Sequence, residues 1–368
     1  MSEAPIPVID LKRQHDSMRA ELDAALKRVV DSSWFMGGPE VKGFESEWAA
    51  YCQVAHSVAV GSGTAALNLT LRALGVVPGD EVVTVAFTLS ATLDAIVETG
   101  AKPVLVDVDT ETYTLNPSLL AKALSPRTKA VLPVHIYGHP ADMDAISSIA
   151  NGLPVITDAC EAHGALYKGR QVTAFGTASC FSFYPTKNLN ALGDAGGIVT
   201  NDAALAEQLQ MLRHHGWDSR FHSKVSSLNS RMDELQAAVL RAKLPHLEAW
   251  NNKRRAIAQR YDEAVAGTSI ARATHADWAE PSYYIYVIRT QERNALRAAL
   301  TEAGIATDVH WPEPPHLQPA YASLGYGRGS LPVTERLCDE VLTIPMFPEL
   351  PDPEVDRICE ALHRFGTK

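Results

Sequence analysis

A glycine-rich turn in the first part of the chain could bind an anion. It runs from Val60 to Ala66 with the sequence VGSGTAA, between a strand pattern and a helix pattern. Glycines let the backbone approach a ligand closely, and the free N–H groups at a helix N-terminus attract phosphate. The turn also fits a dinucleotide-binding pattern, since Glu81 lies twenty residues after Gly61. That fit is weak, because the acid of a nucleotide-binding unit ends the second strand, whereas Glu81 begins one.

A carboxylate and an amine follow later, each directly after an apolar strand pattern. Asp158 comes directly after the segment 153–157, and Lys187 follows the segment 181–183. A buried carboxylate needs a cationic partner, and a protonated pyridine nitrogen would serve as one. Burial and neighbouring positive charge lower the pKa of a lysine, which frees its amine to attack an aldehyde.

Each of these features has a simpler explanation when it is taken alone. Asp158 could cap a helix, Lys187 could lie on an exposed loop, and the glycines could serve only a tight turn. Their order favours one shared site, because the phosphate turn comes first, Asp158 second, and Lys187 twenty-nine residues beyond Asp158. Ser182 and Thr186 add hydroxyls that could help to hold an anion. The dinucleotide interpretation leaves the carboxylate and the amine without a role.

The elements that must position these groups alternate between strand and helix patterns from about residue 54 to 200. Such alternation predicts a mostly parallel sheet with helices on both faces, in which the loops at the carboxyl ends of the strands gather the ligand. The predicted strands are 57–60, 81–85, 104–106, 130–136, 155–157, 180–183 and 198–200. The predicted helices between them are 64–74, 90–99, 117–124 and 141–150.

The pattern changes after Asn201, where helical periodicity dominates. Helices are predicted over 203–214 and 233–266, followed by a strand over 283–289, a helix over 292–303, a strand over 306–310, a proline-rich loop over 312–319 and two last helices. We therefore predict two domains. Residues 1–244 form a large α/β domain, and residues 245–368 form a small α+β domain, with the N-terminal segment packed beside it.

The composition excludes several classes of function. The 368 residues carry a net charge of −10, which argues against a groove for nucleic-acid phosphates. No apolar stretch is long enough to span a bilayer, and none near the start resembles a signal peptide. The five cysteines are scattered without metal-ligand spacing, so we expect reduced thiols, no metal site and a cytoplasmic location.

Taken together, the motifs are similar to those of a known family, the nucleotide-sugar aminotransferases of the DegT–DnrJ–StrS type. The similarity covers nearly the whole chain in nine segments. They are IDL at 9–11, GPEV at 38–41, GSGTA at 61–65, DACEAHGA at 158–165, FSFYPTKN at 181–188, GDAGG at 193–197, NSRMDE at 229–234, PHLQPAY at 315–321 and LPVTE at 331–335. The resemblance implies the aspartate-aminotransferase-like fold of pyridoxal-phosphate enzymes, fold type I. That fold has a seven-stranded, mostly parallel sheet and a smaller C-terminal domain.

The resemblance also implies roles for single residues. Lys187 would hold pyridoxal 5′-phosphate as a Schiff base, and Asp158 would pair with the ring nitrogen. Asn229 resembles the residue that the family sends from the neighbouring subunit, which implies a homodimer with shared active sites. Three places depart from the common pattern. One is Ser227 and Leu228, which precede Asn229 where glycine and an aromatic residue are common. The other two concern cofactor contacts. Glu161 stands where many members have glutamine at the phenolic oxygen and should share or carry a proton, and Leu89 stands where an aromatic ring usually stacks on the cofactor, so either Leu89 or Phe87 would contact it. The remaining implied ligands are Gly63, Thr64, Ala65 and Ser182 for the phosphate and, for the substrate, Trp34, Arg220, His310 and His316.

The implied reaction moves an amino group from L-glutamate, which leaves as 2-oxoglutarate, to a nucleotide-linked 3- or 4-ketosugar. Some members carry histidine in place of the Schiff-base lysine and act as sugar dehydratases, so Lys187 favours transamination. Three alternatives stay open at this point: a dehydratase or lyase with the same cofactor, a non-catalytic protein that binds pyridoxal phosphate, and a nicotinamide-dependent oxidoreductase.

Overall fold

Seven strands form the central sheet of the computed structural model, which describes residues 5–367. Four strands pair in the order β1 (His56–Val60), β9 (Gly196–Thr200), β8 (Ala178–Ser182) and β5 (Ile156–Asp158). Three more pair in the order β4 (Thr128–Val131), β2 (Glu81–Val85) and β3 (Lys102–Val106). Parallel bridges from Val131 to Val155 and from Val134 to Asp158 join the two sets into one sheet. Only β9 runs antiparallel to its neighbours, so the predicted seven-stranded, mostly parallel sheet is confirmed.

The sheet is buried on both faces, which explains its nearly continuous apolar strands. In β2, Val82 belongs to one hydrophobic cluster and Val83 to another, because successive side chains point to opposite faces. Cys180 and Phe181 of β8 alternate in the same way. Every strand residue of β2 is buried, including Glu81 and Thr84.

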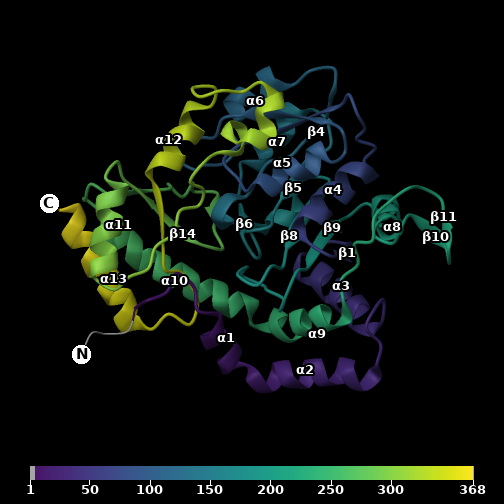
Figure 1. Ribbon diagram of the computed structural model, residues 1–368, viewed down its shortest axis with the longest axis horizontal. Helices are drawn as coiled ribbons and strands as arrows, with labels where there is room; N and C mark the ends of the chain where they lie inside the picture. Colours follow the sequence, from purple (N-terminus) through teal and green to yellow (C-terminus); the bar gives the residue numbers. More distant parts are fainter. Residues whose placement is uncertain (1–4, 368) are drawn as a thin grey trace.

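Helices cover both faces of this sheet (Figure 1). Leucines of α4 (Gly63–Ala73) and α8 (Ala203–Leu212) pack into the core that holds Val82. Buried residues of α6 (Pro117–Ala123) and α7 (Met143–Ala150) pack into the core that holds Val83. Ala95 and Ile96 of α5 (Ser90–Val97) pack into the core that holds Val82. The large parallel unit therefore has the three layers that the alternating pattern predicts.

The predicted long helix over 233–266 is two helices. α9 (Glu234–Lys243) and α10 (Leu247–Val265) are separated by a 3₁₀ turn at Leu244–His246. The turn contains Pro245, which has no N–H for a helical hydrogen bond, and this accounts for the break. α9 packs against α2 (Arg19–Ser32) and α3 (Pro39–Tyr51), which follow α1 (Leu11–Ser17).

The C-terminal part has its own hydrophobic cluster around a small sheet of β12 (Ala271–Arg272), β14 (Tyr286–Arg289) and β15 (Val341–Ile344). The prediction of a strand at 306–310 is wrong. This run makes a single bridge, from Asp308 to Thr343, and the preceding Ile305 makes one to Ile6. The unpredicted β15 pairs with β14 instead. The helices around this sheet are α10, α11 (Arg293–Glu302) and α13 (Asp352–Gly366), whereas α12 (Pro332–Glu340) precedes β15.

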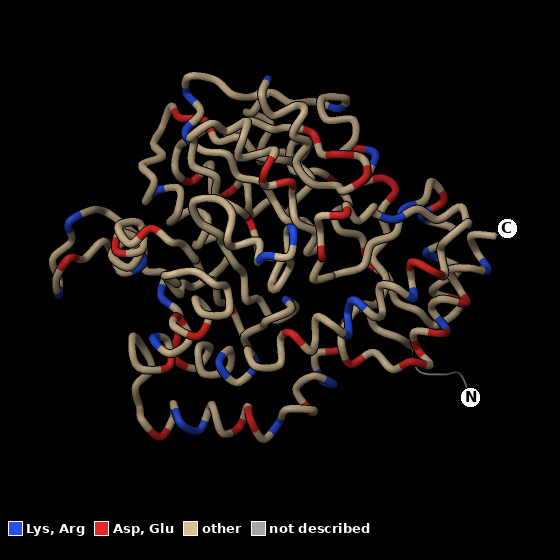
Figure 2. Tube along the Cα trace, turned by 180° about the vertical axis from the view of Figure 1, so that it is seen from behind, with Lys and Arg blue, Asp and Glu red and all other residues tan. Residues whose placement is uncertain are grey.

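Short elements complete the chain. β6 (Leu166–Tyr167), β7 (Arg170–Gln171) and β13 (Ala279–Glu280) form a small sheet, and β10 (Trp217–Ser219) with β11 (His222–Ser223) forms a hairpin that projects from the body near α8 (Figure 1). Acidic and basic residues alternate along α2 (Figure 2), where Arg19 pairs with Asp23 and Lys27 with Asp31. Within residues 5–367, no helix has the length and apolar character needed to cross a bilayer.

Candidate active site

A cavity of about 500 Å³ lies where β5 and β8 end and α4 and α5 begin. This is the edge at which parallel sheets gather ligands, as the alternating pattern predicts. The segments of its wall come from both the central sheet and the C-terminal part of the chain. Its polar lining residues are Ser62, Thr64, Thr88, Thr92, Asp158, Glu161, Ser182, Tyr184, Thr186, Lys187, Asp194, Tyr284, Asp308 and His310.

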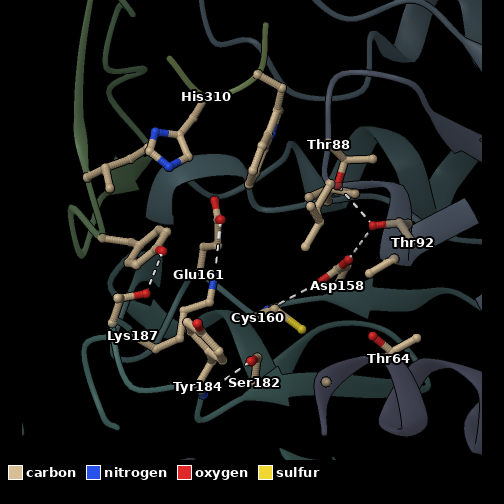
Figure 3. A pocket seen from close by; sticks show the side chains of 18 of the residues that line it. Thr64, Thr88, Thr92, Asp158, Cys160, Glu161, Ser182, Tyr184, Lys187 and His310 are labelled. Atoms are coloured by element: carbon tan, nitrogen blue, oxygen red, sulfur yellow. Dashed lines mark hydrogen bonds and ion pairs between the residues drawn. The ribbon is translucent and has the colours of Figure 1, made fainter. Parts of the chain in front are cut away.

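Asp158 is a buried carboxylate at the last position of β5. Its Oδ2 accepts a hydrogen bond from the Thr92 hydroxyl at 2.8 Å, and its Oδ1 accepts one from the Cys160 N–H at 3.2 Å (Figure 3). Burial raises the pKa of Asp158, and these hydrogen bonds oppose the rise only in part. Among the described residues, no Lys, Arg or His lies within ion-pair distance of it. The pocket thus holds an acidic group that lacks its cation.

Lys187 follows β8 and points into the same cavity (Figure 3). Its Nζ donates to Glu161 Oε1 at 3.1 Å and lies 3.9 Å from the centre of the Tyr284 ring. The second oxygen of Glu161 accepts the Tyr137 N–H at 2.8 Å, which fixes the carboxylate toward the amine. Because both charged groups are more than nine-tenths buried, the pair is shielded from water and from salt.

The expected lowering of the Lys187 pKa is wrong for this arrangement. Burial is the largest single effect and acts to lower the pKa, but the charges of Glu161, Tyr284 and Cys160 and the hydrogen bond to Glu161 together outweigh it, so the net pKa of Lys187 is raised. The sequence-based argument assumed a neighbouring positive charge, whereas the neighbour is an acid. The amine is therefore held as an ammonium group, oriented by Glu161, until a reaction partner takes its proton.

We expect Glu161→Gln to lower the pKa of Lys187, since the amide keeps the shape of the side chain and removes its charge. More of the amine would then be uncharged near neutral pH. The pH profile for capture of pyridoxal phosphate by the cofactor-free protein, followed by visible absorbance, should shift to lower pH. Glu47→Gln, which removes an exposed partner of Arg241, is the control. An unchanged profile in Glu161→Gln would contradict the assignment.

The glycine turn lies at the N-terminus of α4, as predicted. Ser62 caps the helix by accepting the Ala65 N–H at 3.1 Å, so Ala65 is already engaged and does not line the cavity. Gly63 and Thr64 do line it, and helix geometry leaves their N–H groups without intrahelical acceptors. Gly196 of β9 lets the two backbones meet closely, because a Cβ there would lie 2.2 Å from the Ser62 carbonyl oxygen.

Replacing Gly63 by alanine should weaken cofactor binding at least about tenfold through displacement of this turn. The added Cβ would lie 2.7 Å from Ser182 Cβ and 2.8 Å from Cys160 Sγ, so the turn or β8 must move. Gly61→Ala is the matched control, because the nearest atom to its Cβ is the Ser230 hydroxyl oxygen at 3.3 Å and the nearest backbone atom lies at an ordinary contact distance of 3.6 Å. Equilibrium titration with pyridoxal phosphate measures both variants. Equal affinities would show that the turn does not bind the phosphate.

Leu89 and His310 are also brought to the cavity. Leu89 is 49% exposed and lines the wall, while Phe87 is fully buried in the core, so of these two side chains Leu89 is the one that faces the cavity. A hydrogen bond of 2.9 Å joins His310 Nδ1 and the Thr343 hydroxyl, and burial lowers the pKa of His310. Trp311 lines the wall beside it.

Besides Ala65, four predicted residues lie outside this cavity. The prediction of a substrate contact for His316 is wrong for this pocket: its ring is buried on the proline-rich loop, with Nε2 3.2 Å from Glu335 Oε1. Trp34 is 56% exposed, Arg220 belongs to the projecting hairpin, and Asn229 binds Arg231 Nε through its side-chain oxygen at 2.9 Å. None of these three lines the cavity of its own chain.

Sequence reasoning missed several groups that complete the site. Thr92 supports Asp158, and Thr88 in turn shares a hydrogen bond with Thr92 at 2.9 Å. Tyr284 lies under the Lys187 amine and binds the Thr186 hydroxyl at 3.0 Å. Thr92 lies in the first turn of a helix that follows a buried strand, which is a usable signal. Tyr284 comes from a distant segment, and no local pattern indicated it.

These residues fit pyridoxal phosphate. The buried carboxylate lacks a cation that a pyridinium nitrogen would supply, the open N–H groups of α4 suit a phosphate, and the buried lysine suits the aldehyde. Within the described residues no cluster of metal-ligating side chains exists.

Comparison with known proteins agrees with this assignment. The sequence model of the DegT/DnrJ/EryC1/StrS aminotransferase family matches residues 16–363. A dTDP-3-amino-3,4,6-trideoxy-alpha-D-glucose transaminase of Streptomyces venezuelae is 45% identical over 371 residues, covering 100% of this chain and 98% of that protein. A UDP-N-acetyl-3-dehydro-alpha-D-glucosamine 3-aminotransferase of Acidithiobacillus ferrooxidans is 41% identical, covering 98% of this chain and 97% of that protein.

Solved structures give the same result. A crystal structure of S. venezuelae DesV in complex with a ketimine intermediate superposes with a TM-score of 0.97 at 45% identity and covers 99% of both chains. NtdA from Bacillus subtilis with bound cofactor PMP superposes with a TM-score of 0.90 at 30% identity, covering 99% of this chain and 86% of that one. The fold is that of type I pyridoxal-phosphate enzymes, the cofactor is pyridoxal phosphate, and the chain belongs to the DegT/DnrJ/EryC1/StrS family of aminotransferases.

Proposed function

We propose that this enzyme transfers the amino group of L-glutamate to a nucleotide-linked ketosugar. One observation carries the proposal: a single cavity joins the Lys187 amine, the unpaired Asp158 carboxylate and the open N-terminus of α4. The nucleotide-linked sugar is supported by relatives whose names specify dTDP- and UDP-linked amino sugars. Relatives named for 3-amino, 3-dehydro or 3-oxo sugars support amination at C3, and we propose C3 for this enzyme.

The cofactor supplies an aldehyde for the lysine and a ring that withdraws electrons from the bound amino donor. The protein does the rest. Asp158 would hold the ring nitrogen and keep it protonated, because a buried carboxylate without another cation favours that pairing. Lys187 would hold the aldehyde and act as the group that carries a proton at the reacting carbon, with Glu161 orienting its amine. Leu89 and Trp311 enclose the cavity with apolar surface, which limits water near the reacting atoms.

The spectrum of the purified protein before and after addition of L-glutamate tests this function. We expect visible absorbance that glutamate bleaches, release of 2-oxoglutarate, and recovery of the absorbance when a nucleotide-linked 3-ketosugar is added. A 4-ketosugar with the same nucleotide is the matched control for position. Failure of every ketosugar to restore the absorbance would refute the proposed acceptor, and absence of bleaching would refute the proposed donor.

We further propose a homodimer in which Asn229 serves the neighbouring site. Asn229 does not line its own cavity, and the described residues that do line it include no cation other than Lys187 and, when protonated, His310. A doubly charged phosphate would therefore gain from groups of a second subunit. The exposed apolar side chains of Trp34, Phe35 and Met36 offer surface for such an interface. Arg220 on the projecting hairpin is proposed to reach the partner's substrate in the same way.

Mixed dimers distinguish sharing from a site built within one chain. A Lys187→Ala subunit and an Asn229→Ala subunit are each expected to have little activity as homodimers. In a mixed dimer, one site combines an intact Lys187 with an intact Asn229 from the other chain, so activity should return. No recovery in verified mixed dimers would contradict the sharing of sites.

We also infer a cytoplasmic location, which the five free cysteines support.

A further inference from the structure

Lys243 is an ammonium group buried without a carboxylate. It is the last residue of α9 and is 0% exposed. Within residues 5–367, no acidic side chain forms an ion pair with it. Its Nζ donates to the side-chain oxygen of Asn190 and lies 3.4 Å from His15 Nε2. A buried lysine of this kind is costly to the fold, so a compensating role is expected.

Asn190 connects this ammonium group to the segment that carries Lys187. Its Nδ2 donates to the Lys187 carbonyl oxygen at 3.0 Å and to Gln14 Oε1 at 3.0 Å, and its own oxygen is the acceptor for Lys243. All four side chains are at least nine-tenths buried. Asn190 can bind the Lys187 carbonyl only with its amide nitrogen turned toward it, and Lys243 fixes that orientation by binding the oxygen.

Other contacts also hold the segment around Lys187, among them the Ala191 N–H bound to the Phe183 carbonyl at 2.8 Å and Asn188 Nδ2 bound to Asn251 Oδ1 at 2.9 Å. The Lys187 N–H binds the Tyr184 carbonyl at 2.9 Å within the same turn, and Asn188 is anchored through Nδ2 to the Ser282 carbonyl at 2.8 Å. The carbonyl of Lys187 itself is held by Asn190. Glu161 orients the amine from within the cavity, whereas the contacts through Asn190 and Lys243 tie the main chain of Lys187 to α9.

We propose that Lys243 is a positioning residue, which acts through Asn190 to hold Lys187 in place for reaction with the cofactor aldehyde. Neither Lys243 nor Asn190 lines the cavity, so neither would touch a cofactor bound there. Burial lowers the pKa of Lys243 to about 8, and the charge of Glu349 opposes this shift. Burial lowers the pKa of His15, and the charge of Lys243 lowers it further.

The rate at which cofactor-free protein captures pyridoxal phosphate tests the inference without donor or acceptor. Lys243→Met removes the charge and keeps the length of the side chain. We expect capture to slow about ten- to hundredfold, since small displacements of a reacting group have effects of this size. Lys243→Arg, which keeps a donor for Asn190, should restore part of the rate. Arg241→Met on the same helix removes the ion pairs to Glu40 and Glu47 and should leave the rate unchanged.

A double-mutant cycle separates positioning from general destabilisation. Asn190→Ala alone should slow capture by a similar factor, and Lys243→Met in the Asn190→Ala background should slow it no further, because both changes break one chain of contacts. Circular dichroism establishes that each variant is folded at the temperature of measurement. If Lys243→Met does not fold, Asn190→Ala compared with Arg241→Met decides the question.

Two results would overturn the inference: wild-type capture in Asn190→Ala, or additive effects of the two substitutions. The inference rests on the proposed function only for the identity of the lysine that reacts. A protein that captures pyridoxal phosphate normally but fails to transfer an amino group would refute the proposed function and leave this inference standing. Borohydride reduction followed by peptide mapping at Lys187 identifies the captured residue in every variant.

Discussion

Lys187→Ala is expected to reduce turnover by about 10⁴-fold or more, because it removes the attachment of the cofactor and the group that moves the proton. The change also leaves Glu161 buried without its partner at 3.1 Å. Single-turnover bleaching by L-glutamate measures the effect on the chemistry of the first half of the reaction. Cofactor content, measured in parallel, separates lost chemistry from lost binding.

Lys168→Ala is the matched control for this experiment. Lys168 also pairs with an acid, Asp144, but its side chain is 52% exposed and lies away from the cavity. Its removal should leave turnover unchanged, since exposed ion pairs contribute little to the stability of the fold. Near-normal bleaching in Lys187→Ala, or loss of activity in Lys168→Ala, would require a different lysine as the site of attachment.

Asp158→Asn is expected to have the second largest effect. The amide keeps the volume of the carboxylate and can still accept from Thr92, but it cannot hold a proton on the ring nitrogen. Breaking a buried ion pair by removing one charge costs about 3–5 kcal/mol, which corresponds to a loss of about 10²–10³-fold or more in rate. The rate of bleaching by L-glutamate in the cofactor-loaded variant is the measurement.

In the cofactor-free protein, the same substitution should stabilise the fold relative to the wild type as pH rises, although it slows the reaction of the loaded enzyme. The folded-state pKa of Asp158 is raised, so the unfolded state loses this proton first, and ionisation destabilises the fold as pH increases above about 4. Asparagine has no proton to lose. The Tm of Asp158→Asn minus that of the wild type should therefore increase between about pH 4 and pH 7. A difference that stays constant would mean that Asp158 is not desolvated in the absence of cofactor.

Much of the fold could be predicted because its determinants are local. The strands at 81–85 and around Asp158, for example, are short apolar runs between helix patterns. Each of the seven strands of the sheet overlaps a strand predicted from the sequence. Errors arose where distant segments compete. The run 306–310 has strand character, but β15 occupies the place beside β14, and Pro245 ends a helix whose apolar periodicity continues past it. The domain boundary between residues 244 and 245 stays a prediction, and Leu247 and Tyr284 share a hydrophobic cluster with the central sheet.

The sequence by itself determined the parts of the site that follow directly from a strand. Asp158, Lys187 and the turn at Gly63 each follow such a run, and they meet at one sheet edge because β5, β8 and β1 run in the same direction, β1 and β8 being joined through the antiparallel β9. Tertiary structure decided the electrostatics. Glu161 faces Lys187 and reverses the expected pKa shift, Asn190 links Lys187 to α9, and the loop of His316 turns that ring away from the cavity. These outcomes depend on which side chains meet across long separations in sequence, and no local pattern encodes such contacts.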